Sequence, residues 1–198
     1  MWVVADATKD GSETGSSMEQ ALHFKRLGLN LHDTMIYMKD APQFPDANRY
    51  GQVWEFAFVL SAGMPKTKNL ICDRKNVSFG RTVTGTDRNA DGTTRKKSCF
   101  GNDIKEYGQR FNVWQYASTK GNGETEHPAP YPYALARDHV LTWSNPGDLV
   151  LDPFSGSGTT AKAAQELGRR FLGFEINPEY CAIAERRLSQ QVLELESV

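Results

Sequence analysis

The stretch Leu149–Thr160, with the sequence LVLDPFSGSGTT, constrains the fold of this chain more than any other segment. An apolar run leads into an acid and then into a loop of small residues, which is typical of a strand that turns into a helix at a nucleotide-binding site. A second apolar run, Arg170–Glu175, follows the helical segment and also ends in an acid. The order strand, loop, helix, strand, acid predicts one βαβ half-unit of a parallel sheet.

The small residues of this loop indicate a nucleoside-containing cofactor. Gly156 and Gly158 allow the backbone to approach a ligand and to turn into a helix N-terminus. Glu175 follows Gly158 by 17 residues, where a carboxylate can accept both hydroxyls of a ribose. The loop has no Gly-Lys-Ser/Thr, and Ala161 stands where a dinucleotide fingerprint has its third glycine. Ser157 and the loop amides suit the carboxylate of S-adenosylmethionine instead.

The composition is that of an ordinary globular protein. The 198 residues, 39% hydrophobic and 24% charged, are enough for one domain with a core and a small insert. The net charge of −1 means that any basic surface must be local. The three cysteines, odd in number and far apart, predict free thiols in a reducing compartment, and neither they nor the histidines show metal-ligand spacing.

The location follows from the same features. The N-terminal apolar run is too short for a signal peptide or a membrane span. We therefore expect a cytoplasmic protein that contacts no membrane and holds no metal.

Other elements are predicted from apolar periodicity and turn residues. Ser16–Glu19 has the pattern of a capping box, and Asn177 with Pro178 forms a second helix start. We find no internal repeat. The predicted strands are Trp2–Ala5, Leu31–Lys39 and Val53–Ser61, and the predicted helices cover 16–27, 133–143, 159–167 and the segment after Asn177.

The segment Met64–Asn112 is locally basic. It holds eleven Lys or Arg against five Asp or Glu, a balance of +6 in a chain of −1. Most charge-rich loops are solvated and bind nothing, and charge alone favours that interpretation. The alternative is a surface that contacts phosphates.

The motif LDPFSGSGTT followed by GFEINPEY resembles the cofactor-binding region of DNA amino-methyltransferases. These enzymes modify the exocyclic amine of adenine (N6) or cytosine (N4). In their permuted β class the catalytic half comes first, the target-recognition region second and the cofactor half last, which accounts for the late position of this loop. The stretches MWVVADAT, LHDTMIYMK and HPAPYPYALARDHVLTWSNPGDLVLDPF extend the resemblance over nearly the whole chain.

The resemblance implies a fold and a division of the chain. The fold is an α/β, Rossmann-like S-adenosylmethionine-dependent methyltransferase sheet with strand order 3-2-1-4-5-7-6, here incomplete and carrying a basic recognition insert. Residues 1–63 would form the end of the catalytic half with strands 5, 6 and 7. Residues 64–126 would form the target-recognition region, and residues 127–198 the cofactor half with strands 1 and 2.

The resemblance also implies site residues. S-adenosylmethionine would be bound by His127, Asp152, Phe154, Gly156, Ser157, Gly158, Thr159, Glu175 and Asn177. Duplex DNA would be contacted by Arg74, Lys75, Arg81, Arg95, Lys96 and Lys97. For His127 a purely structural role is an equal alternative, and Trp114 and Tyr116 are expected to pack rather than to stack on a base.

The family's catalytic motif is not found in the sequence. That motif is Asp, Ser or Asn followed by Pro-Pro-Tyr, and it holds the target amine of a flipped base toward the sulfonium methyl group. The chain has no Pro-Pro pair, and Asn177-Pro-Glu-Tyr180 has a complete explanation as a helix start. We therefore predict no catalytic residue here, and expect the motif in a segment before Trp2. The alternatives are an inactive DNA- or cofactor-binding remnant and a methyltransferase for RNA or small molecules.

Overall fold

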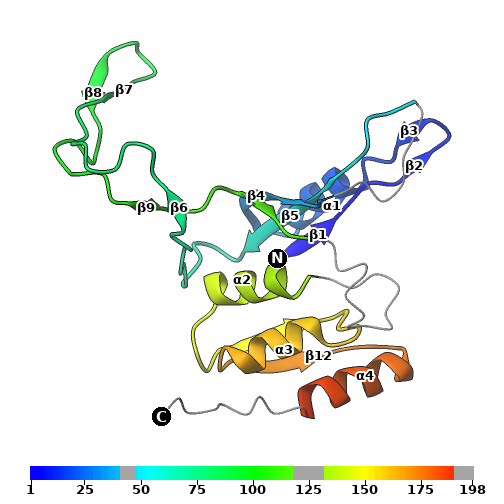
Figure 1. Cartoon of the computed structure of the whole chain (residues 1–198). Helices are drawn as coiled ribbons and strands as arrows, with labels where there is room; N and C mark the ends of the chain where they lie inside the picture. Colours follow the sequence, from blue (N-terminus) through cyan, green and yellow to red (C-terminus); the bar gives the residue numbers. More distant parts are fainter. Residues whose placement is uncertain (41–47, 118–131, 190–198) are drawn as a thin grey trace, which may run out of the picture. The chain divides into compact units, whose positions relative to one another are not determined.

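The computed structural model describes residues 1–40, 48–117 and 132–189. The chain divides into two compact units, which we describe separately (Figure 1). The larger unit comprises Met1–Asn69 and Asn112–Val198, and the smaller unit is Leu70–Phe111. The smaller unit lies inside the segment predicted for target recognition, and that role remains a prediction.

The first part of the larger unit is a four-stranded sheet in the order β1-β5-β4-β10. β5 runs antiparallel to both β1 and β4, and β10 runs parallel to β4 at the far edge. The strands are β1 (Trp2–Val4), β4 (Asn30–Met38), β5 (Trp54–Ser61) and β10 (Val113–Gln115). The first three strands have the order 5-7-6 expected from the resemblance, whereas β10 was not predicted as a strand.

The core of this sheet comes from a continuous buried run in β5 and from alternating buried residues in β4. Ala57, Phe58 and Val59 of β5 are buried, as are Met35 and Tyr37 of β4. A strand buried on both faces has such a continuous apolar run, which explains why VWEFAFVLS is readable as a strand from sequence.

The helix α1 (Ser16–Arg26) begins by a different device from the predicted capping box. Gly15 is its N-cap in the left-handed conformation, and the helix has no local side-chain cap. The Asp6 carboxylate instead accepts the Ser17 amide at 2.9 Å and the Ser16 hydroxyl at 3.0 Å. A distant carboxylate thus accepts one of the first amides of the helix, in place of the local box, and it also complements the helix dipole. Between Asp6 and α1 lie the short strands β2 (Thr8–Lys9) and β3 (Ser12–Glu13).

The second part of the larger unit is the predicted βαβ half-unit. β11 (Leu149–Asp152) pairs in parallel with β12 (Arg170–Gly173), and α3 (Thr159–Glu166) connects them. A small core of Ala136, Val140 and Ala163 joins α3 to α2, with Val150 of β11 against it. The flanking helices are α2 (Tyr133–Trp143) and α4 (Pro178–Ser189). All three helices therefore form where the sequence predicts them.

The smaller unit is a β-ribbon with no fully buried residue. β6 (Arg74–Lys75) pairs with β9 (Tyr107–Gly108), and β7 (Thr86–Arg88) pairs with β8 (Thr94–Lys96), all antiparallel. A single bridge between Thr82 and Asp103 lies between the two ladders. Each residue from Leu70 to Phe111 keeps at least part of its surface accessible. Backbone hydrogen bonds rather than an apolar core therefore hold this ribbon together.

Candidate cofactor site

The loop between β11 and α3 is shaped by short-range hydrogen bonds. Oδ1 of Asp152, the last residue of β11, accepts the Phe154 amide at 3.0 Å. The Gly158 amide donates to the Ser155 carbonyl at 3.0 Å. Gly156 and Gly158 have φ values of 52° and 80°. Two positive-φ turns in three residues are what a Gly-x-Gly loop provides at low steric cost.

Glu175 holds this loop to the end of β12. Its Oε2 accepts the Gly156 amide and its Oε1 accepts the Asn177 amide, both at 2.8 Å. Both carboxylate oxygens of Glu175 thus accept a backbone amide of this region. The predicted ribose ligand is therefore also the residue that fixes the loop.

Gly158 is required by packing against α4. A Cβ added at Gly158 would lie 2.8 Å from the Ala184 Cβ and 3.2 Å from its Cα. From the sequence we predict that a ligand lies close to the Gly158 backbone. In the structure the close neighbour of Gly158 is Ala184 of α4. The loop and α4 therefore pack with no space for a side chain.

Arg187 of α4 is a loop-positioning residue that the sequence argument missed. Its Nη1 donates to the Ser157 carbonyl at 2.7 Å, to the Ser157 hydroxyl at 3.1 Å and to the Thr159 hydroxyl at 3.3 Å. Ser157 and Thr159 are both buried. An arginine two turns into a polar helix face gives no sequence signal, because its partners lie about 30 residues away.

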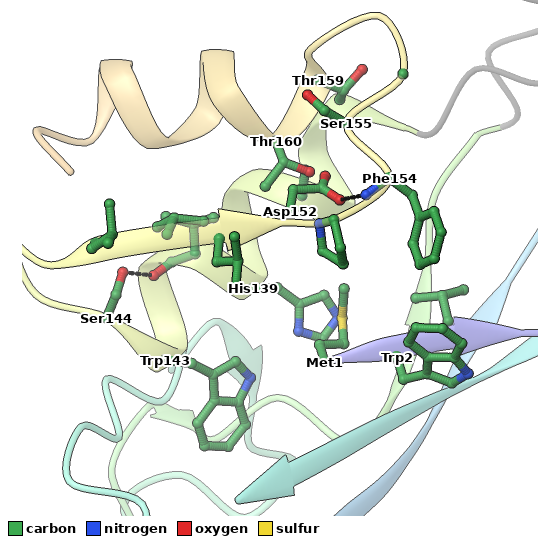
Figure 2. A pocket seen from close by; sticks show the side chains of 18 of the residues that line it. Met1, Trp2, His139, Trp143, Ser144, Asp152, Phe154, Ser155, Thr159 and Thr160 are labelled. Carbon is green, nitrogen blue, oxygen red and sulfur yellow. Dashed lines mark hydrogen bonds between the residues drawn. The ribbon is translucent and has the colours of Figure 1, made fainter. Parts of the chain in front are cut away.

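A cavity of about 670 Å³ lies beside the loop (Figure 2). This volume is within the usual range for small-molecule sites. The predicted cofactor residues that line it are Asp152, Phe154, Gly156, Ser157 and Thr159. Gly158, Glu175 and Asn177 are not among its lining residues. Asn177 is engaged elsewhere, since its Oδ1 accepts the Glu179 amide at 2.9 Å and caps α4. His127 lies outside the described residues.

The cavity extends along two strands that do not pair with each other. Its walls include Met1, Trp2 and Val3 on one side and the β11 residues on the other. In the part of the chain that the structure describes, β1 pairs with β5 and β11 pairs with β12. The side chains of Leu149 and Leu151 on β11 are 54% and 57% exposed. Within this part of the chain, β1 and β11 each have one edge with no pairing strand. The exposed leucines of β11 form an apolar surface beside that edge.

Two side chains of α2 that line this cavity, the buried His139 and the half-buried Trp143, have buried ring nitrogens. Among the described residues, neither ring nitrogen of His139 has a hydrogen-bond partner, and the same holds for Nε1 of Trp143. Figure 2 shows the His139 imidazole directed into the cavity beside Met1. Burial, with a smaller contribution from the Met1 amino group, lowers the pKa of His139 to about 3. The imidazole stacks on the Trp114 ring with 4.6 Å between the ring centroids. His139 is therefore a neutral imidazole at neutral pH, packed against an aromatic ring. Trp114 is buried and packs as expected.

The chemistry of the site fits S-adenosylmethionine. The first amides of α3 have no partner within the helix and point toward the loop end, where a methionine carboxylate would be stabilised. The predicted role of Glu175 is to accept the ribose hydroxyls. The exposed Phe154 ring and the apolar β11 side chains would provide a surface for an adenine base.

The predicted DNA-contacting residues all lie in the smaller unit. Arg74 is half-buried, packs on the Phe111 ring at 4.4 Å and donates to the Gln109 carbonyl. Lys96 is exposed and lies 4.5 Å from the centre of the Phe100 ring. The remaining four predicted residues are exposed: Lys75, Arg81, Arg95 and Lys97.

Two further features of the described residues bear on the class of protein. They contain no group of three or more His, Cys, Asp or Glu side chains able to hold a metal ion. Within the same ranges no helix combines the length and apolarity that a membrane crossing requires.

Comparisons with known proteins agree with this site. The family model described as DNA methylase (N6_N4_Mtase) matches residues 3–186. The orphan methyltransferase M.BamHII of Bacillus amyloliquefaciens is 50% identical over 98% of this chain and 75% of its own length. The DNA adenine methyltransferase YhdJ of Escherichia coli is 46% identical over 79 residues, which are 39% of this chain and 27% of that protein.

Solved structures with the same fold include methyltransferases. The complex of M1.HpyAVI with S-adenosylmethionine has a TM-score of 0.60 and 25% identity, over 87% of this chain and 69% of that one. The cytosine-N4-specific PvuII methyltransferase has a TM-score of 0.66 and 19% identity, over 93% of this chain and 61% of that one. The cofactor of this chain is thus S-adenosylmethionine, and the chain belongs to the N6/N4 DNA methylase family.

Proposed function

We propose that this chain supplies the cofactor and DNA surfaces of a methyltransferase that acts on the exocyclic amine of cytosine (N4) or adenine (N6) in duplex DNA. In that reaction the amine nitrogen gains the methyl group of the sulfonium and loses a proton, and S-adenosylhomocysteine leaves. The loop fixed by Glu175 beside the cavity is the observation that carries the proposal. The exposed basic side chains of the ribbon support the DNA part of it.

We further propose that the catalytic tetrapeptide comes from a segment that precedes Met1 in the permuted enzyme. Of the two segments that resemble the motif, Asp152-Pro-Phe154 lies where β11 ends and the loop after it begins. The nearer match, Asn177-Pro-Glu-Tyr180, forms the start of α4, since Asn177 caps the Glu179 amide. Among residues 1–40, 48–117 and 132–189, one edge of β1 and one edge of β11 have no pairing strand, and both strands line the same cavity, which supports a strand inserted between them. The uncovered apolar side chains of β11 support additional structure over that sheet.

Binding measurements on a folded preparation of the chain, co-expressed with the proposed catalytic segment where solubility requires it, test the first proposal. Calorimetry should detect S-adenosylmethionine, and fluorescence anisotropy at moderate salt should detect tighter binding of duplex DNA than of duplex RNA. Preference for RNA would favour the RNA methyltransferase alternative. Binding of cofactor without either nucleic acid would favour a small-molecule enzyme or a cofactor-binding remnant.

The cellular location is a separate inference. Cys72 and Cys99 are exposed free thiols and Cys181 is a partly exposed one, and a reducing cytoplasm suits them. Alkylation of intact cells followed by mass spectrometry would test it, because thiols reduced in the cell react and disulfide-bonded cysteines do not.

A further inference from the structure

The two halves of the smaller unit, which we call its first and second arms, are related by an internal two-fold axis. This finding corrects the sequence-based prediction that the chain has no internal repeat. Adding 21 to the number of a residue in the first arm gives its counterpart in the second arm. The β6–β9 pairs Arg74–Gly108 and Lys75–Tyr107 thereby correspond to the β8–β7 pairs Arg95–Asp87 and Lys96–Thr86. Both ladders are antiparallel, and each joins the start of one arm to the end of the other.

The hydrogen bonds between the ladders obey the same relationship. Gly80 donates to the Ile104 carbonyl and Gly101 to the Val83 carbonyl, at 3.1 and 2.9 Å. Val83 donates to Asn102, and Ile104 donates to Arg81, both at 2.9 Å. The bridge between Thr82 and Asp103 joins two residues that are each other's counterparts, so the two-fold axis passes through it.

Each arm also contains the same turn with similar side chains. Phe79 donates to the Asn76 carbonyl in one turn, and Phe100 donates to the Lys97 carbonyl in the other. The glycine that follows each phenylalanine has a positive φ, 78° at Gly80 and 85° at Gly101. The sequences RKNVSFG and RKKSCFG share Arg-Lys at the start and Phe-Gly at the end. The repeat is therefore visible mainly in the backbone.

The two-fold axis places basic residues in matched pairs. Arg74 and Lys75 correspond to Arg95 and Lys96, and both lysines are exposed. Residues 70–111 hold nine Lys or Arg against five Asp or Glu, a balance of +4. Four of the nine basic residues are matched in this way, and the two exposed lysines among them suit a polyanion that itself repeats under a two-fold rotation.

We propose that the ribbon binds duplex DNA with its two-fold axis on a two-fold axis of the double helix, so that Lys75 and Lys96 contact phosphates of opposite strands equivalently. This inference rests on the DNA binding in the proposed function. The two strands of a duplex run antiparallel, so their phosphate positions repeat under such a rotation whatever the base sequence. Phosphate contacts fix register without reading sequence, and these would orient the ribbon on its target.

Matched single and double variants of the full chain test this inference. The affinity for a fluorescein-labelled duplex is measured over a range of NaCl concentrations. Lys75→Ala and Lys96→Ala should each reduce the salt slope by about 0.9, and the double variant by about twice that amount. Lys75→Arg and Lys96→Arg should keep the slope, because they keep the charge. Lys25→Ala, which removes an exposed charge from α1 in the larger unit, is the control that should change nothing.

The outcomes separate the two proposals. If the unmodified chain does not bind duplex DNA, the proposed function fails. If the chain binds DNA but only one of the two alanine variants lowers the slope, the two-fold docking is wrong and DNA binding stands. The same conclusion follows if neither variant lowers it. Circular dichroism on each variant checks that the exposed substitutions leave the fold intact.

Discussion

At the scale of single residues, Glu175 supports the loop and is also the residue predicted to bind the ribose of the cofactor. Glu175→Ala should weaken S-adenosylmethionine binding by about 1–3 kcal/mol, because ligand hydroxyls and the Gly156 amide would lose their acceptor. Titration calorimetry measures the loss, and thermal unfolding shows how much comes from the loop. Glu185→Ala on the exposed face of α4 is the control. Equal cofactor affinity in Glu175→Ala and the unmodified chain would mean that the site is misplaced.

Gly158 gives a stability prediction with an internal rescue. Gly158→Ala should destabilise the fold by about 1–2 kcal/mol for the left-handed backbone and about 1–3 kcal/mol more for the contact with Ala184. Gly168→Ala has a similar φ of 72° with open space around it, and should show the backbone cost alone. Urea unfolding compares the two variants. The double variant Gly158→Ala/Ala184→Gly should regain the packing part, and no regain would mean that α4 is not the close neighbour.

His139 should make the stability of the fold depend on pH. Its pKa is lowered to about 3 by burial, against about 6.5 in an unfolded chain. The unfolded chain therefore binds the extra proton first, and stability falls as pH decreases from about 6.5 toward 3, by up to about 1.4 kcal/mol per pH unit. Above pH 6.5 the imidazole is neutral in both states and contributes no dependence.

Replacement of the imidazole tests that pH dependence. His139→Phe keeps a ring against Trp114 but cannot be protonated, so it should lose about 1 kcal/mol less between pH 7.5 and 5.5 than the unmodified chain. Urea unfolding at the two pH values gives the difference, and His23→Phe on the exposed side of α1 is the control. Identical pH dependence in His139→Phe and the unmodified chain would show that His139 is not buried as described.

At the scale of elements, β8 and the turn after it hold three consecutive basic residues. The triple change Arg95/Lys96/Lys97→Ala should weaken DNA binding for all sequences and flatten the salt dependence by about one unit of slope per lost contact. All three side chains are exposed, so the ribbon backbone should persist. Anisotropy titrations on two unrelated duplexes measure both effects. An unchanged salt dependence of DNA affinity would mean that residues 95–97 form an ordinary solvated segment that does not contact DNA.

At the scale of the whole molecule, the cavity beside β1 and β11 bears on the proposal of an added segment. We expect the 198-residue chain to aggregate readily and to be inactive alone, because within the described residues two strand edges and the apolar face of β11 lie open. Co-expression with a polypeptide that carries the proposed catalytic segment should restore solubility and methyl transfer. The assay is transfer of labelled methyl groups from S-adenosylmethionine to duplex DNA. Robust transfer by residues 1–198 alone would contradict this and return Asn177-Pro-Glu-Tyr180 to consideration.

Sequence by itself determined the local elements and the cofactor loop. β5, β11 and the helices follow from apolar periodicity, and Gly-x-Gly with a following acid depends on spacing within one βαβ unit. These features are local, so the order of residues is enough to predict them. The absence of the catalytic tetrapeptide could also be seen in the sequence, because a motif of four consecutive residues is recognised without knowledge of the fold.

Only the tertiary structure decided which residues meet across long separations. Arg187 of α4 donates hydrogen bonds to the loop after β11, and the Asp6 carboxylate accepts an amide at the start of α1. His139 of α2 lines a cavity that β1 also lines. None of these pairings is encoded in a local pattern, because each depends on how separate elements pack. The two-fold symmetry of the ribbon could not be recognised in the sequence for a related reason. The symmetry lies in backbone hydrogen bonds, which most side chains allow, and only Arg-Lys and Phe-Gly recur in the two arms.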